Sequence, residues 1–229
     1  MTRLVLLPGM DGTNAFFQPF VASCPSGIAL QTLEYDRLDA TSYEALRDQV
    51  AAALPKQDFF VLGWSFSGPL ALLLAAKQIP NLRGVILVAS FVWRPVRFLP
   101  PWLTLFVRPY MFTMYPLASM GQALLQGYST PEVRALQHQA FSRAAPHALA
   151  ARVRMLLSVD VRSELRTCPV PILYLRAEHD RVIHRRHGET IAAQAPQATL
   201  LDIPGPHLCL ATHPDQAWNA IQAFLDAQR

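Results

Sequence analysis

The stretch Gly63-Trp64-Ser65-Phe66-Ser67-Gly68 stands between two apolar runs, residues 59–62 and residues 70–76. The first run has the length of a buried strand, and the second begins a helical pattern. A serine between small residues at a strand-to-helix turn is typical of a nucleophile elbow, which holds the serine in a strained backbone conformation. Such a turn needs small residues two before and two after the serine. Gly63 meets this need, and Ser67 stands where glycine is usual.

Short apolar runs alternate with helical patterns along the rest of the chain. Thr41 and Glu44 have the spacing of a capping box, and apolar residues then recur at helical intervals. Thr212 and Asp215 repeat that spacing before a last apolar stripe, with Pro214 at an allowed first-turn position. This alternation predicts an α/β fold, a mostly parallel sheet with helices on both faces. The candidate strands are residues 4–7, 28–33, 59–62, 85–88, 171–175 and 199–203.

Residues 91–160 interrupt the alternation. The first part of this segment is rich in proline and aromatic residues, and the part from about residue 132 to 157 has a helical pattern. We interpret it as a helical cap inserted over the carboxyl edge of the sheet, where ligands bind in open α/β folds. The core is then residues 1–90 together with residues 161–229. The alternative is that the segment only adds helices to the core.

A serine hydroxyl is a weak nucleophile, so Ser65 needs a base and an acid that orients the base. In folds with this elbow the acid follows the serine in the chain, and the histidine follows the acid. Asp180 lies in the loop after the predicted strand 171–175, and His207 lies in the loop after the strand 199–203. Glu178 competes for the role of the acid. Asp160, from an earlier segment, and His213, beside a predicted helix start, are the remaining alternatives.

From residue 4 to residue 225 the chain resembles the α/β-hydrolases of the serine esterase, lipase and thioesterase type. The resemblance rests on the elbow, on the Asp180 loop and on the His207 loop, in that order. It favours Asp180 over Glu178, because the family has an aspartate followed closely by an apolar residue. It also implies a trimmed sheet of about six strands, without the two antiparallel strands that often come first.

The opening residues Leu6-Leu7-Pro8-Gly9-Met10-Asp11-Gly12-Thr13 resemble the oxyanion loop of the same family. The resemblance implies that the backbone N–H groups of Met10 and Phe66 bind the oxyanion. The family often has His-Gly where this chain has Pro8-Gly9, but a backbone donor does not require that histidine. No metal and no organic cofactor is implied.

Composition excludes several other classes. Of the 229 residues 52% are hydrophobic and 16% charged, which excludes intrinsic disorder. The net charge of +4 comes from arginines spread along the chain, so we expect no nucleic-acid partner. Three scattered cysteines make neither a disulfide framework nor a metal site, and we expect Cys209 to lie in the core. We interpret His179, His184 and His187 as exposed loop residues. No targeting segment is evident, and we expect a cytoplasmic protein.

We therefore predict a serine hydrolase that cleaves an ester or thioester of an apolar acyl group through an acyl-enzyme on Ser65. The alternatives are acyl transfer or carbon–carbon hydrolysis by the same residues, and a non-catalytic module that binds an apolar ligand or a membrane surface. Arg94, Arg97 and Arg108 are candidates for contact with an acidic acyl carrier or a lipid surface. The oligomeric state is left open. The expected pocket residues are Trp64, Phe91, Trp93, Trp102, Phe106 and Tyr110.

Overall fold

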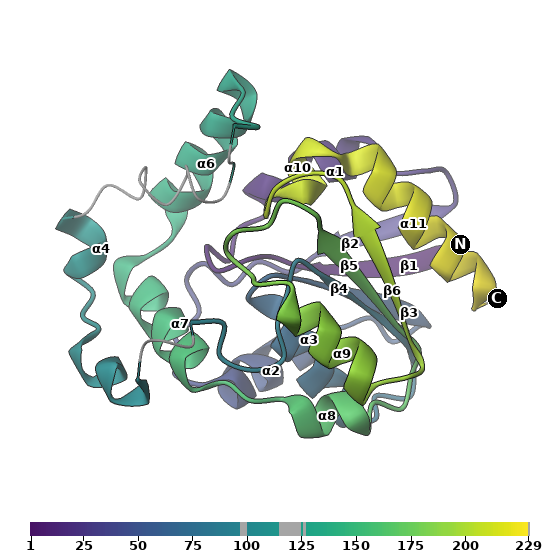
Figure 1. Ribbon diagram of the computed structural model, residues 1–229, viewed down its shortest axis with the longest axis horizontal. Coiled ribbons are helices and arrows are strands. Elements are labelled where there is room, and N and C mark those ends of the chain that lie inside the picture. The colour runs from purple at the N-terminus through teal and green to yellow at the C-terminus, as the bar shows by residue number, and fades with distance from the viewer. Residues whose placement is uncertain (97–99, 115–124, 126, 229) are drawn as a thin grey trace.

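The computed structural model describes residues 1–96, 100–114, 125 and 127–228, and its centre is a six-stranded sheet (Figure 1). The strand order is β2-β1-β3-β4-β5-β6, and every neighbouring pair is parallel. The six strands predicted from the sequence are confirmed. Their bounds are β1 Thr2–Leu7, β2 Ile28–Thr32, β3 Phe59–Trp64, β4 Leu82–Val88, β5 Ile172–Ala177 and β6 Ala198–Ile203.

Helices cover both faces of the sheet, as expected when parallel strands are buried on two sides. In β1, Val5 and Leu7 face one buried cluster, whereas Leu4 and Leu6 face the other. The first cluster contains residues of α2 Tyr43–Ala51, α3 Ser67–Ala76, α8 Arg162–Arg166 and α9 Arg186–Gln194. The second contains residues of α1 Gln18–Ala22, α10 Cys209–Thr212 and α11 Pro214–Ala227, next to the short helix η1 Ala15–Phe17.

Between β4 and α8 the chain forms helices to one side of the sheet (Figure 1). They are η2 Pro101–Phe106, α4 Met111–Met114, α6 Pro131–Arg143 and α7 Pro146–Ser158. α6 contacts η1, which follows β1. These helices therefore lie where the carboxyl ends of the strands meet, which is the edge at which open α/β sheets bind ligands.

Two helices begin one residue later than their capping-box spacings predicted, since neither Thr41 nor Thr212 is the N-cap. In α2 the N-cap is Ser42, whose side chain accepts a hydrogen bond from the N–H of Ala45. Thr41 is one residue too early for this role. In α11 the N-cap is His213, with no capping bond from its side chain, and Pro214 opens the helix. The apolar stripe of α11 is buried as predicted, including Trp218 and Ile221.

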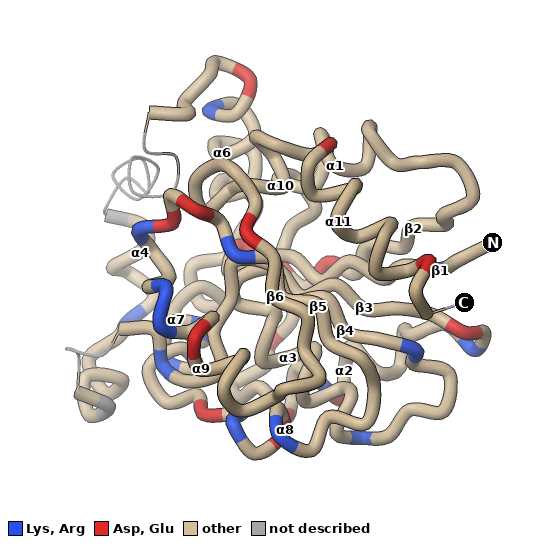
Figure 2. The backbone as a smooth tube through the Cα atoms, turned by 45° about the vertical axis from the view of Figure 1, so that its right-hand side comes forward, with Lys and Arg blue, Asp and Glu red and all other residues tan. Residues whose placement is uncertain are grey.

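Basic and acidic positions are interspersed along the chain trace (Figure 2). Several arginines pair with nearby carboxylates, for example Arg176 with Asp202 at 2.6 Å and Arg143 with Glu34 at 3.1 Å. Among the helices in the described ranges, none is long and apolar enough to cross a membrane.

Candidate active site

Ser65 sits at the turn between β3 and α3 with a φ of 53°. This left-handed conformation is uncommon for a residue other than glycine and is typical of a strained functional turn. The turn is also very tight. A Cβ added at Gly63 would lie 2.3 Å from the carbonyl oxygen of Ser67, so a side chain at position 63 is incompatible with the elbow. The N–H of Ser65 donates to the carbonyl of Val88 at 2.8 Å and fixes the turn to β4.

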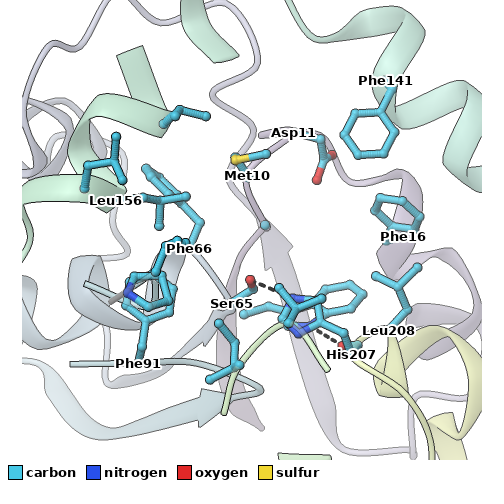
Figure 3. A pocket seen from close by; sticks show the side chains of 18 residues that line it. Met10, Asp11, Phe16, Ser65, Phe66, Phe91, Phe141, Leu156, His207 and Leu208 are labelled. Atoms are coloured by element: carbon cyan, nitrogen blue, oxygen red, sulfur yellow. Dashed lines mark hydrogen bonds between the residues drawn. The ribbon is translucent and has the colours of Figure 1, made fainter. Parts of the chain in front are cut away.

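The side chains of Ser65, His207 and Asp180 form one hydrogen-bonded chain, of which Figure 3 shows the bond between Ser65 and His207. The Ser65 Oγ to His207 Nε2 distance is 2.8 Å, and the His207 Nδ1 to Asp180 Oδ2 distance is 2.7 Å. The side chains of His207 and Asp180 are each 4% exposed, so water competes little for these bonds. In this arrangement the carboxylate orients the imidazole, and the imidazole reaches the hydroxyl.

Backbone N–H groups of the loop that bears Asp180 bind its carboxylate. Its second oxygen, Oδ1, accepts the N–H groups of Val182 and Ile183, both at 2.8 Å. The N–H of His179 donates to the carbonyl of Gly205 at 3.0 Å, which ties the acid loop to the loop that carries His207. Both partners of the pair are therefore fixed by backbone contacts.

The competing candidates lie elsewhere. Glu178 is exposed beside the acid loop. Asp160 is paired with Arg162 at 2.6 Å. The ring of His213 contacts the hydroxyl of Thr212 at 2.9 Å. The structure brings none of the three into the hydrogen-bonded chain at Ser65.

One histidine expectation is wrong. His179 and His184 are exposed, but His187 is 1% exposed and its ring packs against Trp93 with centroids 4.4 Å apart. The reason is that residue 187 lies in α9, on the side facing the sheet. Burial lowers the pKa of His187 to about 4. In the part of the chain that the structure describes, no histidines, cysteines or carboxylates cluster as a metal site.

Ser90 supports the elbow and was not singled out by its sequence context. Its hydroxyl donates to the carbonyl of Ser65 at 2.6 Å. Gly68 makes this possible, because a Cβ there would lie 1.8 Å from the Ser90 Oγ. The Tyr174 hydroxyl donates in turn to the carbonyl of Ser90 at 3.0 Å. A lone serine after a strand carries no pattern that would have revealed this contact.

Met10 and Phe66 line the cavity next to Ser65. The N–H of Gly12 donates to the carbonyl of Gly9 at 3.0 Å, which closes a turn around Met10. Phe66 stands at the start of α3, where the first N–H groups of a helix have no partner within it. Hydrogen bonds among the described residues use neither the Met10 nor the Phe66 amide. Two N–H donors are thus left for a ligand.

The cavity at Ser65 has a volume of about 270 Å³ and an almost wholly apolar lining (Figure 3). Trp64 and Phe91 line this cavity, as predicted from the sequence. Trp64 also donates its indole N–H to the carbonyl of His207 at 3.3 Å, so it supports the loop that carries the imidazole.

The other four expected aromatic residues are not part of the lining, which corrects the expectation for them. Trp93 packs on His187 instead. Trp102 and Phe106 on η2 are 58% and 63% exposed, and Tyr110 just before α4 is 62% exposed. Aromatic content alone does not indicate which way a side chain faces: in the same part of the insertion Pro95 and Val96 line the cavity, whereas Trp102, Phe106 and Tyr110 are exposed.

The later helices of the insertion also contribute to the cavity. Phe141 of α6 and three residues of α7 lie in the lining; Phe141 lies next to Phe16 of η1, with ring centroids 6.2 Å apart, and Leu156 lies across the cavity from them (Figure 3). In the sequence these positions have the spacing of an ordinary apolar helix face, so no pattern distinguished them from core residues. The α7 residues are Val153, Leu156 and Leu157.

Cys209 is fully buried as expected, and burial raises the pKa of its thiol, which keeps it protonated.

The arginines of the insertion differ in exposure. Arg108 is exposed and Arg94 is half-buried. Within the described ranges neither side chain forms an ion pair. Arg97 lies outside the described residues.

Curated relatives match nearly the whole chain. The pimeloyl-[acyl-carrier protein] methyl ester esterase of Stenotrophomonas maltophilia (strain K279a) is 29% identical, over 98% of this chain and 93% of the relative. The protein of the same name from Xanthomonas oryzae pv. oryzae (strain MAFF 311018) is 28% identical, over 97% of this chain and 94% of the relative.

Solved structures share the fold at lower identity. The enol-lactonase from Burkholderia xenovorans LB400 has a TM-score of 0.84 at 16% identity, over 98% of this chain and 91% of that one. The bromoperoxidase from Bacillus anthracis also has a TM-score of 0.84, at 15% identity, over 98% of this chain and 92% of that one. A model of the Alpha/beta hydrolase family matches residues 4–221. The chain belongs to the α/β-hydrolase family.

Proposed function

We propose that the protein is a serine hydrolase that cleaves a carboxylic ester of an apolar acyl group through an acyl-enzyme on Ser65. One observation carries the proposal: the hydrogen-bonded chain Asp180–His207–Ser65 ends in an apolar cavity. The full-length similarity to two methyl ester esterases supports an ester as the scissile group.

In the first step Ser65 attacks the acyl carbon while His207 Nε2 takes its proton. The imidazolium is stabilised by Asp180, which stays ionised and accepts a hydrogen bond from the Nδ1–H group of His207. His207 then returns the proton to the alkoxide leaving group, and the acyl-enzyme forms. In the second step His207 deprotonates water, which attacks the acyl carbon and releases the acid and the free serine.

The Met10 and Phe66 amides are the proposed donors to the tetrahedral oxyanion. Both border the cavity, and neither is used within the described part of the protein. Removal of one such donor typically costs about 3 kcal/mol of transition-state stabilisation. The low polarity of the lining strengthens these interactions, because little water competes for them.

The acyl chain is proposed to lie between the core and the inserted helices. The lining includes residues of η1 and α6 on one side and of α7 on the other, with Phe16, Phe141 and Leu156 around the space next to Ser65 (Figure 3). We propose residues 91–160 as a cap for this reason: α6 and α7 supply Phe141, Leu156 and further apolar residues of the lining. A mostly apolar cavity with a few polar groups at one end is typical of a small-molecule site.

We further propose an acidic acyl carrier as the partner that delivers the acyl chain. Both relatives named above are esterases of an acyl-carrier-linked methyl ester by name. The cap offers Arg94 and Arg108, which form no ion pair in the described structure, and Trp102 and Phe106, a few residues before Arg108, are exposed. Arginine and aromatic side chains are enriched at protein interfaces.

A fluorophosphonate label tests the nucleophile. The wild-type protein is expected to take up one label, Ser65→Ala none, and Ser163→Ala, an exposed serine of α8, the same amount as wild type. Label that persists in Ser65→Ala overturns the assignment of Ser65. Turnover of a chain-length series of p-nitrophenyl esters then separates an esterase from a binding module, and competition by an added alcohol detects acyl transfer.

A matched pair of charge reversals tests the carrier. A carrier-linked methyl ester is compared with the same methyl ester free in solution. Arg108→Glu is expected to lower kcat/KM about 10-fold for the carrier-linked ester alone, most strongly at low salt. Arg3→Glu is the control, because Arg3 is exposed on β1 near its amino end, away from the cavity. Equal kcat/KM for both substrates, unaffected by Arg108→Glu, excludes this docking face.

A further inference from the structure

Arg152 is a charged residue buried where no carboxylate pairs with it. It lies in α7, its exposure is 2%, and within the described ranges it forms no ion pair. A guanidinium taken out of water costs free energy unless its hydrogen bonds are fully replaced. Its Nη1 donates to the carbonyls of Met10 at 2.8 Å and Asp11 at 2.9 Å, and its Nη2 donates to the carbonyl of Tyr35. The guanidinium also stacks over the Tyr35 ring at 5.2 Å.

The contacts of Arg152 converge on the turn that presents the Met10 amide. That turn runs from Gly9 to Gly12, and Gly12 has a φ of 76°. A Cβ on Gly12 would lie 2.8 Å from both terminal nitrogens of Arg152, so the glycine is what allows the guanidinium to come this close. Glycine at both ends also leaves the peptide planes of the turn free to rotate unless something holds them.

We propose that Arg152 is a positioning residue, which fixes the Met10–Asp11 and Asp11–Gly12 peptides and thereby aims the Met10 N–H at the oxyanion. The inference rests on the proposed function and adds to it a residue from the inserted segment. The N–H of Gly12 holds the carbonyl of Gly9, and with it the Gly9–Met10 peptide that carries the Met10 N–H. Arg152 ties the carbonyl of Met10 to α7, so both peptides that flank Met10 are held only when Arg152 is in place. The consequence is that the oxyanion loop is complete only when α7 is docked.

No other hydrogen bond within the described structure holds these two carbonyls. The Asp11 carboxylate is occupied by the N–H of Thr13 at 2.9 Å and by its hydroxyl, within the loop itself. The carbonyl of Gly12 accepts the N–H of Tyr35 at 2.9 Å, which anchors the far end of the turn. Arg152 therefore joins the middle of this turn to Tyr35, the residue that anchors its far end.

Arg154 provides a matched control on the same helix. It also donates to a backbone carbonyl, that of Val107 at 2.9 Å, but this partner lies within the insertion. Arg152→Met and Arg154→Met remove the same number of donors and the same charge. Arg152→Lys keeps the charge but replaces a planar fork with a single ammonium, which cannot reach three carbonyls in the same geometry.

The test compares these variants with wild type in ester hydrolysis and in inhibition by a trifluoromethyl ketone that carries the same acyl chain. The ketone adduct has the oxyanion, whereas the bound ester does not. Arg152→Met is expected to lower kcat about 100-fold with KM changed less than about threefold, and to weaken ketone binding by about the same factor as kcat. The kcat and the ketone affinity of Arg152→Lys are expected to lie between those of wild type and Arg152→Met. Arg154→Met is expected to have wild-type values of both.

Assays are run well below the Tm of each variant, so that lost stability does not count as lost kcat. Wild-type kcat in Arg152→Met, or a kcat loss without a parallel loss of ketone affinity, overturns the positioning role while leaving the proposed function intact. If Arg152→Met does not fold, Arg152→Lys decides in the same way. A wild-type protein that neither turns over esters nor takes up a fluorophosphonate overturns the proposed function, and this inference with it.

Discussion

The hydroxyl of Ser67 lies against the carbonyl of Pro8, 59 residues earlier in the chain, and both meet the hydroxyl of Tyr35. Ser67 stands where an elbow usually has glycine, and it is fully buried. The replacement keeps the elbow sterically possible and adds a hydrogen bond that a glycine could not make. It connects the turn bearing Ser65 to the loop bearing the Met10 amide.

Ser67→Gly, which restores the usual residue, is expected to lower the free energy of unfolding by about 1–3 kcal/mol, because buried polar partners lose their hydrogen bond. Chemical denaturation of Ser67→Gly, Tyr35→Phe and the double variant measures this. The two losses are expected to be non-additive, since both changes disrupt one cluster. Additive losses would mean that the two hydroxyls act independently.

Gly63→Ala is expected to abolish labelling of Ser65 and to destabilise the fold by about 3 kcal/mol or more. The added Cβ would lie 2.3 Å from the carbonyl oxygen of Ser67, and backbone cannot move aside as a flexible side chain can. The control is Gly27→Ala, where nothing lies within 4 Å and only the φ of 89° is unfavourable. That variant is expected to lose about 1–2 kcal/mol and keep full activity.

Asp180→Asn is expected to reduce kcat by about four orders of magnitude, because an amide stabilises neither the required tautomer nor the imidazolium of His207. Glu178→Gln makes the same chemical change two residues away, on an exposed side chain, and is expected to leave kcat unchanged. Steady-state ester hydrolysis by the two variants decides the identity of the acid. A larger loss in Glu178→Gln would transfer the role to Glu178.

The buried His187 is expected to make stability fall as pH falls from about 6.5 to about 4. In the folded protein the pKa of His187 is lowered to about 4 by burial, whereas the unfolded value is 6.5. Between these values the unfolded chain binds a proton that the folded chain does not, so acid favours unfolding. The contribution is present above the unfolded pKa and amounts to at most about 3 kcal/mol.

His187→Phe keeps an aromatic ring against Trp93 and removes the titration. Its free energy of unfolding is expected to vary less with pH than that of wild type across this window. His138→Gln, at an exposed position of α6, is the control and should retain the wild-type slope. Parallel curves for wild type and His187→Phe would show that His187 is not held neutral by the fold.

The sheet was predictable because each strand is a local apolar run closed by its own turn residues. The run at residues 59–62 followed by Gly63 and Ser65 needed no information from elsewhere in the chain. The loops bearing Asp180 and His207 could be located for the same reason, since each directly follows a strand. Parallel strands bring their carboxyl ends to one edge, so chain order alone predicted that these side chains meet.

The walls of the cavity could not be predicted in this way. Phe141 and Leu156 lie on helices whose apolar faces read as core in sequence, while Trp102 and Phe106 read as pocket residues and are exposed. Hydrophobicity indicates that a side chain is buried, but not which of several apolar surfaces it packs against. That choice depends on how α6 and α7 are docked.

The sequence by itself determined the strand-helix order, the strained turn at Ser65 and the loops that carry its partners, because these follow from steric and periodic rules acting over a few residues. Only the tertiary structure decided the contacts of Ser67 with Pro8, of Ser90 with the elbow and of Arg152 with the Met10 turn. Such contacts join residues far apart in the chain. Their geometry is set by the packing of whole elements, which no local pattern records.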